Sequence, residues 1–119
     1  MKTNHLFLDV SEINNYGQII SEIINDPNFE HIYDVEAYIA DIDKKRDLNS
    51  LEHKRAVFTI IKGLLDTSLI EVDTQFIRPK HVQNPKTEEE LFAYLDEYWD
   101  KVDKDIRGYL VFFENKKQI

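Results

Sequence analysis

The chain has 119 residues, no cysteine and a formal net charge of −8, and 42% of its residues are hydrophobic. This length and composition predict one folded domain with a packed core, and they exclude a disordered chain. Without cysteine there can be no disulfide, no thiolate metal site and no cysteine nucleophile. The net negative charge disfavours nucleic acid as a partner, because phosphate is bound mainly through lysine and arginine.

Three helices are predicted in the first half of the chain. Asp9 opens the capping-box pattern Asp-Val-Ser-Glu, which predicts a first helix over residues 9–24. A second helix is expected over residues 34–46, opened by an aspartate as N-cap. A third is expected over residues 50–66, opened by a serine. Its apolar positions cover nearly half of the helical circumference, which indicates that it is the central helix of the fold.

Short strands are predicted on both sides of a fourth helix in the second half. Residues 69–72 and 76–77 are short runs rich in β-branched and aromatic residues, typical of strands, and residues 78–86 form a loop with two prolines. Thr-Glu-Glu-Glu opens the fourth helix, which runs from residue 87 to residue 103 or 105, and residues 109–113 form the last strand. Helical runs followed by short β-rich runs predict an α+β fold of four main helices with a small antiparallel sheet.

No repeat, linker or change of composition divides the chain, so residues 1–119 are expected to form a single domain. The apolar run near the N-terminus is too short for a secretory signal, and no run approaches the length of a membrane span. A cytoplasmic location without membrane contact is therefore expected. The residues predicted to be buried are Ile20, Ile24, Ile39, Val57, Phe58, Ile61, Leu65, Leu95, Val111 and Phe113.

The sequence carries no signature of an enzyme or of a cofactor site. Its four histidines lie far apart and form none of the paired spacings that place two metal ligands on one helical face. Its three glycines stand singly, so there is no phosphate-binding loop, and no serine lies in a nucleophile motif. The sequence therefore predicts a protein that is not an enzyme and that binds no metal or cofactor.

The fourth helix carries most of the excess negative charge. Residues 88–105 contain eight acidic and two basic residues. At 100° per residue, one stripe of this helix, called the acidic stripe below, contains Glu89, Asp96, Asp100 and Asp103. Like charges three or four residues apart weaken a helix by about 0.2–0.5 kcal/mol per pair. The stripe therefore contributes nothing to the local stability of the helix.

Two interpretations of the acidic stripe stay open at the level of sequence. It is either a solvated face of an acidic protein with Trp99 in the core, or a surface that docks on a basic protein. In the second case Phe92 and Trp99, at its edge, would serve as aromatic anchors. If the stripe is not the interface, the second helix offers another acidic group: Glu36, Asp41 and Asp43.

Two segments resemble the immunity proteins of bacterial contact-dependent growth inhibition and related polymorphic toxin systems. One runs from residues 52–58 into residues 69–72, a helix followed by a short strand, and the other is the acidic helix, residues 87–99. The resemblance implies a cytoplasmic inhibitor that binds its cognate toxin domain one to one. Such toxins are often basic nucleases, and the inhibitor covers the active site or a neighbouring surface. These families share no universal motif, so no single residue role follows.

An alternative is a winged-helix-like transcriptional regulator or another non-catalytic adaptor domain. Residues 50–66 would then be the recognition helix, and the strands that follow would be the wing. The basic residues available are Lys54, Arg55, Lys62, Arg78 and Lys80. Acidic residues interrupt the exposed face of this helix, whereas a helix that reads DNA needs a basic one.

Overall fold

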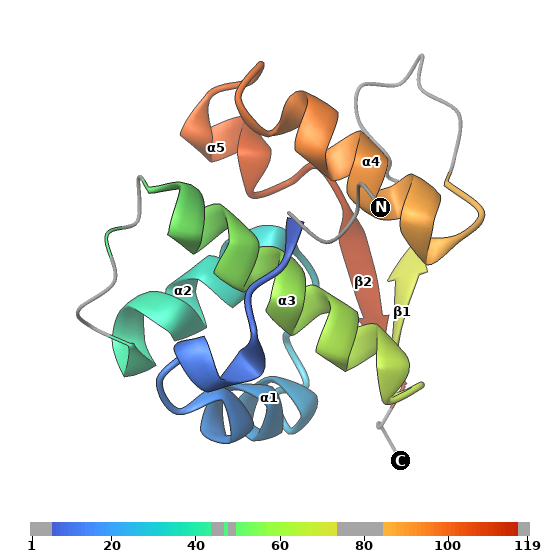
Figure 1. Ribbon diagram of the computed structural model, residues 1–119. Coiled ribbons are helices and arrows are strands. Elements are labelled where there is room, and N and C mark those ends of the chain that lie inside the picture. The colour runs from blue at the N-terminus through green and yellow to red at the C-terminus, as the bar shows by residue number, and fades with distance from the viewer. Residues whose placement is uncertain (1–5, 44–46, 48–49, 74–84, 117–119) are drawn as a thin grey trace.

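The computed structural model describes residues 6–43, 47, 50–73 and 85–116 (Figure 1). In chain order the elements are the 3₁₀ helix η2 (Val10–Glu12), α1 (Tyr16–Ile24), α2 (Ile32–Ile42), α3 (Leu51–Asp66), β1 (Ile70–Asp73), α4 (Glu88–Trp99), α5 (Lys104–Arg107) and β2 (Phe112–Asn115). The described residues thus contain four main helices, α1 to α4, and a small antiparallel sheet. The predicted α+β class is confirmed.

Side-chain caps fix the starts of α3 and α4 where the sequence predicts them. The Ser50 hydroxyl accepts a hydrogen bond from the His53 amide at 3.0 Å. The Thr87 hydroxyl accepts one from the Glu90 amide at 3.1 Å. Each bond satisfies an amide that the first turn of a helix leaves without a partner, and it joins residues only three apart.

The predicted first helix is interrupted. The capping box at Asp9 is present, but it opens only the three-residue helix η2. Asn15 then takes a left-handed backbone conformation with φ of 61°, and α1 begins after it. Ile13, just before the bend, is buried. The bend also changes which face of the helix points to the core, so that α1 buries Ile19 and Ile23. The prediction that Ile20 and Ile24 are buried is therefore wrong, because both pack against the core but are only partly buried.

The start of α2 also differs from the prediction. His31 is the N-cap, and Asp34 is the third residue of the first turn. The Asp34 carboxylate accepts hydrogen bonds from the Glu30 and His31 amides at 2.9 and 3.3 Å. An acidic residue three positions inside a helix can thus satisfy the amides before it, which is the second half of a capping box. The described helix ends at Ile42, and residues 44–46 of the predicted helix lie outside the described residues.

The chain after α4 folds as a turn, a short helix and a strand. Helix α4 ends at Trp99, earlier than the predicted end at residue 103 or 105, and α5 follows. The last strand begins three residues later than predicted, because the Tyr109 amide bonds to the Ile106 carbonyl and continues the turn from α5. Strand β2 pairs antiparallel with β1, with Val72 opposite Phe113. The predicted strand 76–77 lies outside the described residues.

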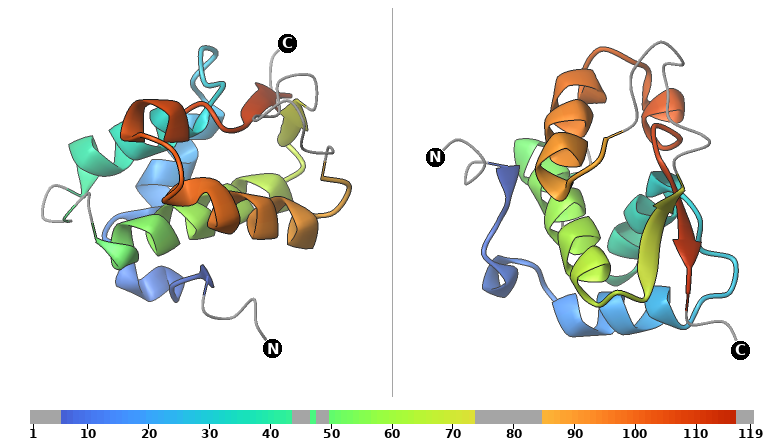
Figure 2. Two further views of the ribbon diagram at one scale, coloured as in Figure 1. Left: turned by 90° about the horizontal axis from the view of Figure 1, so that it is seen from above. Right: turned by 90° about the vertical axis from the view of Figure 1, so that its right-hand side faces the viewer.

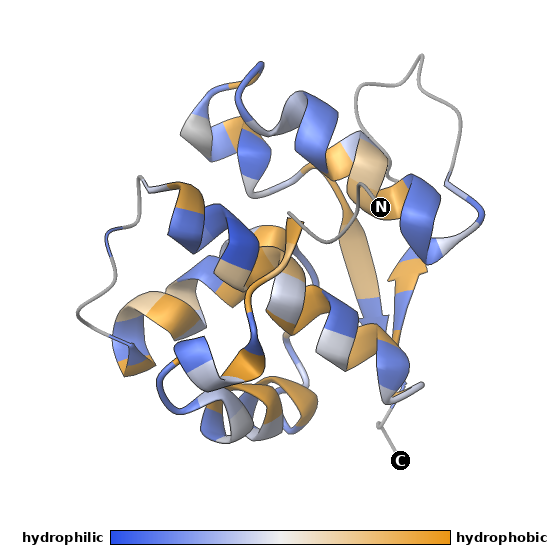
Figure 3. Cartoon of the chain, in the orientation of Figure 1, coloured by the Kyte–Doolittle hydropathy of each residue, from blue (hydrophilic) through white to orange (hydrophobic). Residues whose placement is uncertain are grey.

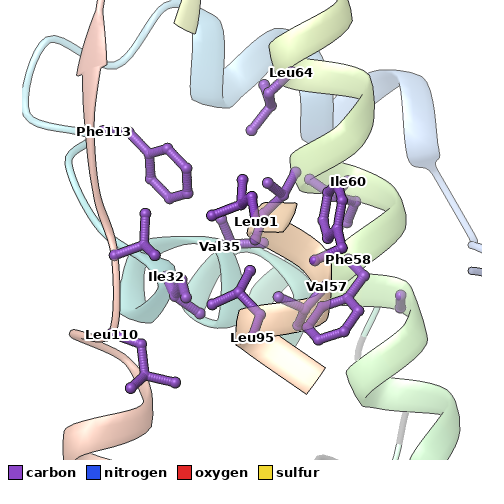
Figure 4. Close-up of a cluster of buried hydrophobic side chains, with 14 of the residues drawn as sticks. Ile32, Val35, Val57, Phe58, Ile60, Leu64, Leu91, Leu95, Leu110 and Phe113 are labelled. Atoms are coloured by element: carbon purple, nitrogen blue, oxygen red, sulfur yellow. The ribbon is translucent and has the colours of Figure 1, made fainter. Parts of the chain in front are cut away.

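Helix α3 occupies the centre of the molecule, as predicted. Both views in Figure 2 place it between the N-terminal segment and β2. Its buried side chains include Val57, Phe58 and Ile60, which meet side chains from α2, α4 and β2 (Figure 4). Colouring by hydropathy shows hydrophobic residues along α3 and along both strands (Figure 3). Seven of the ten residues predicted to be buried are buried; the exceptions are Ile20, Ile24 and Leu65, which are partly buried.

Ile61 and Leu65 form a matched pair for testing the position of α3. Ile61 is fully buried and Leu65, one turn later, is partly buried. Ile61→Ala is expected to lower the free energy of unfolding by about 2–5 kcal/mol, because it leaves a cavity in a close-packed core. Leu65→Ala should cost less, because solvent fills part of the space. Urea unfolding at equilibrium measures both, and equal losses would contradict the placement of the helix.

Candidate protein-binding surface

The acidic stripe is split between α4 and the turn that follows it. Glu89 lies in the first turn of α4, Asp100 is the C-cap of that helix, and Asp103 precedes α5. All three are exposed, and none forms an ion pair with any residue that the structure describes. Asp96 differs, since its carboxylate forms an ion pair with Lys54 on α3. Among the side chains that the structure describes, three carboxylates of the stripe are therefore exposed and without an ion-pair partner.

The position of Asp100 is unfavourable for the helix that it ends. The C-terminus of a helix carries a partial negative charge, which basic residues normally offset. The last turn of α4 contains no basic residue, and its C-cap is an aspartate. No packing or capping role in the described chain explains this choice. Carboxylates that do not stabilise the free protein are typical of a surface that meets a positively charged partner.

Trp99 and Phe92 belong to the core and are not surface anchors. Their exposed fractions are 4% and 2%. The Trp99 ring meets Phe58 edge-on with centroids 5.3 Å apart, and the Arg107 guanidinium lies over it at 4.3 Å. Phe92 meets Phe7 edge-on at 5.0 Å. For these two side chains the core interpretation applies, because an anchor for a partner must be exposed in the free protein.

The acidic group predicted on the second helix, Glu36, Asp41 and Asp43, also contains both buried and exposed residues. Asp43 is buried and accepts a hydrogen bond from the Asn14 amide group at 3.2 Å. Glu36 is largely buried and lies between His53 of α3 and Arg107 of α5. Asp41 is exposed. Glu36 and Asp43 therefore hold the fold together, and Asp41 alone of the three predicted acids is available to a partner.

Glu36 is the centre of a buried ion-pair network, defined by Glu36, His53 and Arg107. Its carboxylate lies 2.9 Å from His53 Nε2 and accepts a bond from Arg107 Nη2 at 2.7 Å. Burial by itself raises the pKa of Glu36. Hydrogen bonds from His53 and Arg107, with the charge of Arg107, outweigh burial and hold this pKa below its ordinary value. The network joins α2, α3 and α5.

Two surface hollows border the unneutralised carboxylates. One, of about 380 Å³, lies between the start of α3 and the turn after α4, and Asp100 contributes to its wall. The other, of about 330 Å³, is lined in part by Glu89, next to the pair of Lys62 with Glu88. Each has room for a side chain of a partner. The lining of the first hollow also contains Lys54 and Arg107, and that of the second contains Lys62, so carboxylates and cations share both hollows.

A surface feature that the sequence did not reveal is an aromatic pair. The rings of Tyr33, in the first turn of α2, and Tyr109, after α5, are stacked with an angle of 9° and centroids 6.1 Å apart. The two residues come from opposite ends of the chain, and no local periodicity links them. The one available signal is composition, since the chain holds six tyrosines.

Two of the three lysine and arginine residues of α3 are held in ion pairs. Lys54 is paired with Asp96, and Lys62 contacts both Asp66 and Glu88 at 3.3 Å. Strand β1, which the winged-helix alternative makes part of a wing, pairs with the C-terminal strand β2. Arg78 and Lys80 lie outside the described residues. These pairings disfavour a DNA-reading role for α3, because phosphate contacts need cations that are free.

Among the described residues, no group of three or more histidine, aspartate and glutamate side chains is placed to hold a metal ion. The same part of the chain has no helix with the length and apolar character that crossing a membrane requires. Comparisons of the chain with protein-family models, curated proteins and solved structures find no match.

The ion-pair network predicts how stability depends on pH. A carboxyl whose pKa is lowered by folding stabilises the fold above its unfolded pKa, near 4.5, and loses this effect as the pH falls through the folded pKa. Glu36→Gln should lower the free energy of unfolding at pH 7 by on the order of 3 kcal/mol, because it leaves Arg107 buried without its partner. The difference should shrink below pH 4.5. Urea unfolding between pH 7 and pH 3.5 measures it.

Glu97→Gln is the control for this pH series. Glu97 lies on an exposed face of α4 and contacts Lys101 at 3.3 Å, with both side chains more than half exposed. Its neutralisation should change the free energy of unfolding by less than about 0.5 kcal/mol across the same pH range. Equal losses from Glu36→Gln and Glu97→Gln would show that the buried network does not stabilise the fold.

Proposed function

We propose that the protein is a non-catalytic inhibitor that binds a basic protein one to one, in the manner of an immunity protein that neutralises a toxin. One observation carries the proposal: Glu89, Asp100 and Asp103 are exposed and unpaired within the described chain, and Asp100 stands where it weakens its own helix. The resemblance of the acidic helix to immunity proteins supports the same class of partner. A basic toxin domain, in the cytoplasm of the cell that makes both proteins, fits this surface.

The physical role of the carboxylates is to steer association. A net charge of −8, concentrated on one helix and the turn after it, attracts a basic partner over about one Debye length, near 8 Å at physiological salt. Charges of this kind act on the association rate more than on the dissociation rate. The inhibitor would then block its partner by occupying the surface that the partner uses, without chemistry of its own.

Neutralising the unpaired part of the stripe tests the steering role. In the variant Glu89→Gln, Asp100→Asn, Asp103→Asn, association should slow by roughly tenfold at low salt, with a flatter dependence on salt. Asp96 is left unchanged, because removing its carboxylate would leave Lys54 without its ion-pair partner. The partner is the protein that the wild-type chain captures from its native host, purified and rebound. Stopped-flow or surface-based kinetics at several salt concentrations measure the rates.

The control is the variant Glu22→Gln, Asp41→Asn, Glu71→Gln, which removes the same charge from exposed positions on α1, α2 and β1. It should slow association much less. If both variants slow association equally, net charge is responsible and the stripe has no special role. If the control alone slows association, the partner docks on a surface other than the stripe, and single substitutions at Glu22, Asp41 and Glu71 would locate it.

A further inference from the structure

Two exposed aromatic side chains are stacked on one another at one place on the surface. Among the described residues, five large hydrophobic residues are exposed, and three of them are Tyr33, Ile106 and Tyr109. Tyr33 and Tyr109 are stacked on one another, and Ile106 lies in α5, three residues before Tyr109. The two tyrosines are 55% and 37% exposed. Monomeric proteins seldom gather aromatic surface in this way unless it meets a partner.

The stacked tyrosines rest on a second layer of rings. His31 meets Tyr109 edge-on with centroids 4.6 Å apart, and Phe112 lies 6.1 Å from Tyr109. His31 and Phe112 also meet edge-on, at 5.5 Å, and their backbones form a β-bridge. The outer pair is therefore supported from below, so that little side-chain entropy remains to be lost when a partner binds.

Gly108 permits the close approach that creates the pair. The Tyr33 amide donates a hydrogen bond to the Gly108 carbonyl at 2.9 Å. A Cβ atom at position 108 would lie 2.9 Å from Tyr33 Cβ and 3.2 Å from Tyr33 Cα, closer than side chains normally pack. The absence of a side chain lets the segment after α5 lie directly against the start of α2, which brings Tyr109 beside Tyr33.

The hydroxyl groups of the pair are available to a partner. The hydroxyl of Tyr38 donates to Asp26 at 2.8 Å, and that of Tyr94 donates to the Leu110 carbonyl at 2.8 Å. Within the described residues, neither Tyr33 nor Tyr109 makes such a bond. Each therefore presents an apolar ring and a free hydrogen-bonding group. This combination makes tyrosine common among residues that dominate binding energy.

We infer that the tyrosine platform, Tyr33 and Tyr109 with His31 and Phe112 beneath, is the anchoring site for the basic protein partner. The inference rests on the proposed function. Its occupant follows from charge, because exposed acids flank the platform in the chain: Glu30 before Tyr33, and Asp103 and Asp105 before Tyr109. The same stretch of chain also contains Lys104 and Arg107, and Arg107 is already bound by Glu36.

The same charges argue against a second copy of this chain as the occupant. In a symmetric dimer the platform of one molecule would face that of the other, and each acidic rim would face an identical rim. Like charges across an interface oppose association. A basic surface has the complementary charge. The acidic stripe would then steer the partner, and the tyrosine platform would hold it.

Kinetics with the captured and purified basic partner test the platform. Tyr33→Ala and Tyr109→Ala should each raise the dissociation rate by about tenfold or more, with the association rate changed by less than about twofold. Tyr33→Phe keeps the ring and should restore most of the residence time. The control is Val10→Ala, at an exposed residue of η2, on the far side of α3 from β2 (Figure 2). Thermal unfolding of each variant confirms that it is folded.

A photo-cross-linking amino acid at position 33 provides a second measurement that does not depend on the stability of a variant. It should cross-link to the basic partner, and the same group at position 10 should not. Two results would contradict the anchoring role of the platform: unchanged dissociation rates of both alanine variants, or cross-linking at position 33 to a second copy of this chain. Neither result would affect the steering role of the acidic stripe. If wild-type protein captures no basic protein that rebinds after purification, both the proposed function and the anchoring role of the platform are contradicted.

Discussion

The buried carboxylate of Glu36 determines how the C-terminal part of the chain lies on the rest. It holds His53 of α3 and Arg107 of α5 from its position on α2, so one side chain joins three helices. Arg107 is thereby fixed over the face of Trp99, where its charge gains a favourable contact with the ring. A buried arginine without a carboxylate would be costly, so the position of α5 depends on Glu36.

The proposed binding surface inherits its geometry from this network. Once Arg107 is fixed, the next residue, Gly108, lies against the start of α2, and Tyr109 follows beside Tyr33. The turn that carries Asp100 and Asp103 connects α4 to the same fixed helix. The positions of the steering carboxylates and of the tyrosine platform on the surface thus both depend on the contact between Glu36 and Arg107. A change at Glu36 would disturb both, although Glu36 itself is largely buried.

How far the sequence predicts the fold depends on the range of the interaction involved. The caps of Ser50 and Thr87 are hydrogen bonds between residues three positions apart, so the local sequence pattern predicts them. The wide apolar face of α3 likewise identifies the central helix. The phase of α1 could not be predicted, because it depends on the left-handed conformation of one residue, Asn15.

The candidate site was predicted less well, for the same reason. The stripe carboxylates follow from helical spacing, but the burial of Trp99 is set by Phe58 and Arg107, which reach it from other elements. The tyrosine platform exists only because two distant segments meet at Gly108. Spacing along one helix identifies which residues share a face. It does not show which face the rest of the chain will cover.

Asp100 at the end of α4 also has a consequence for the evolution and engineering of the chain. The free protein is locally frustrated there, because the residue that ends the helix opposes the field of the helix itself. A bound cationic partner would relieve this conflict, so the complex gains stability that the isolated chain lacks. Selection for thermal stability alone would favour lysine at this position. A variant optimised in that way would be a more stable protein with a poorer surface for its partner.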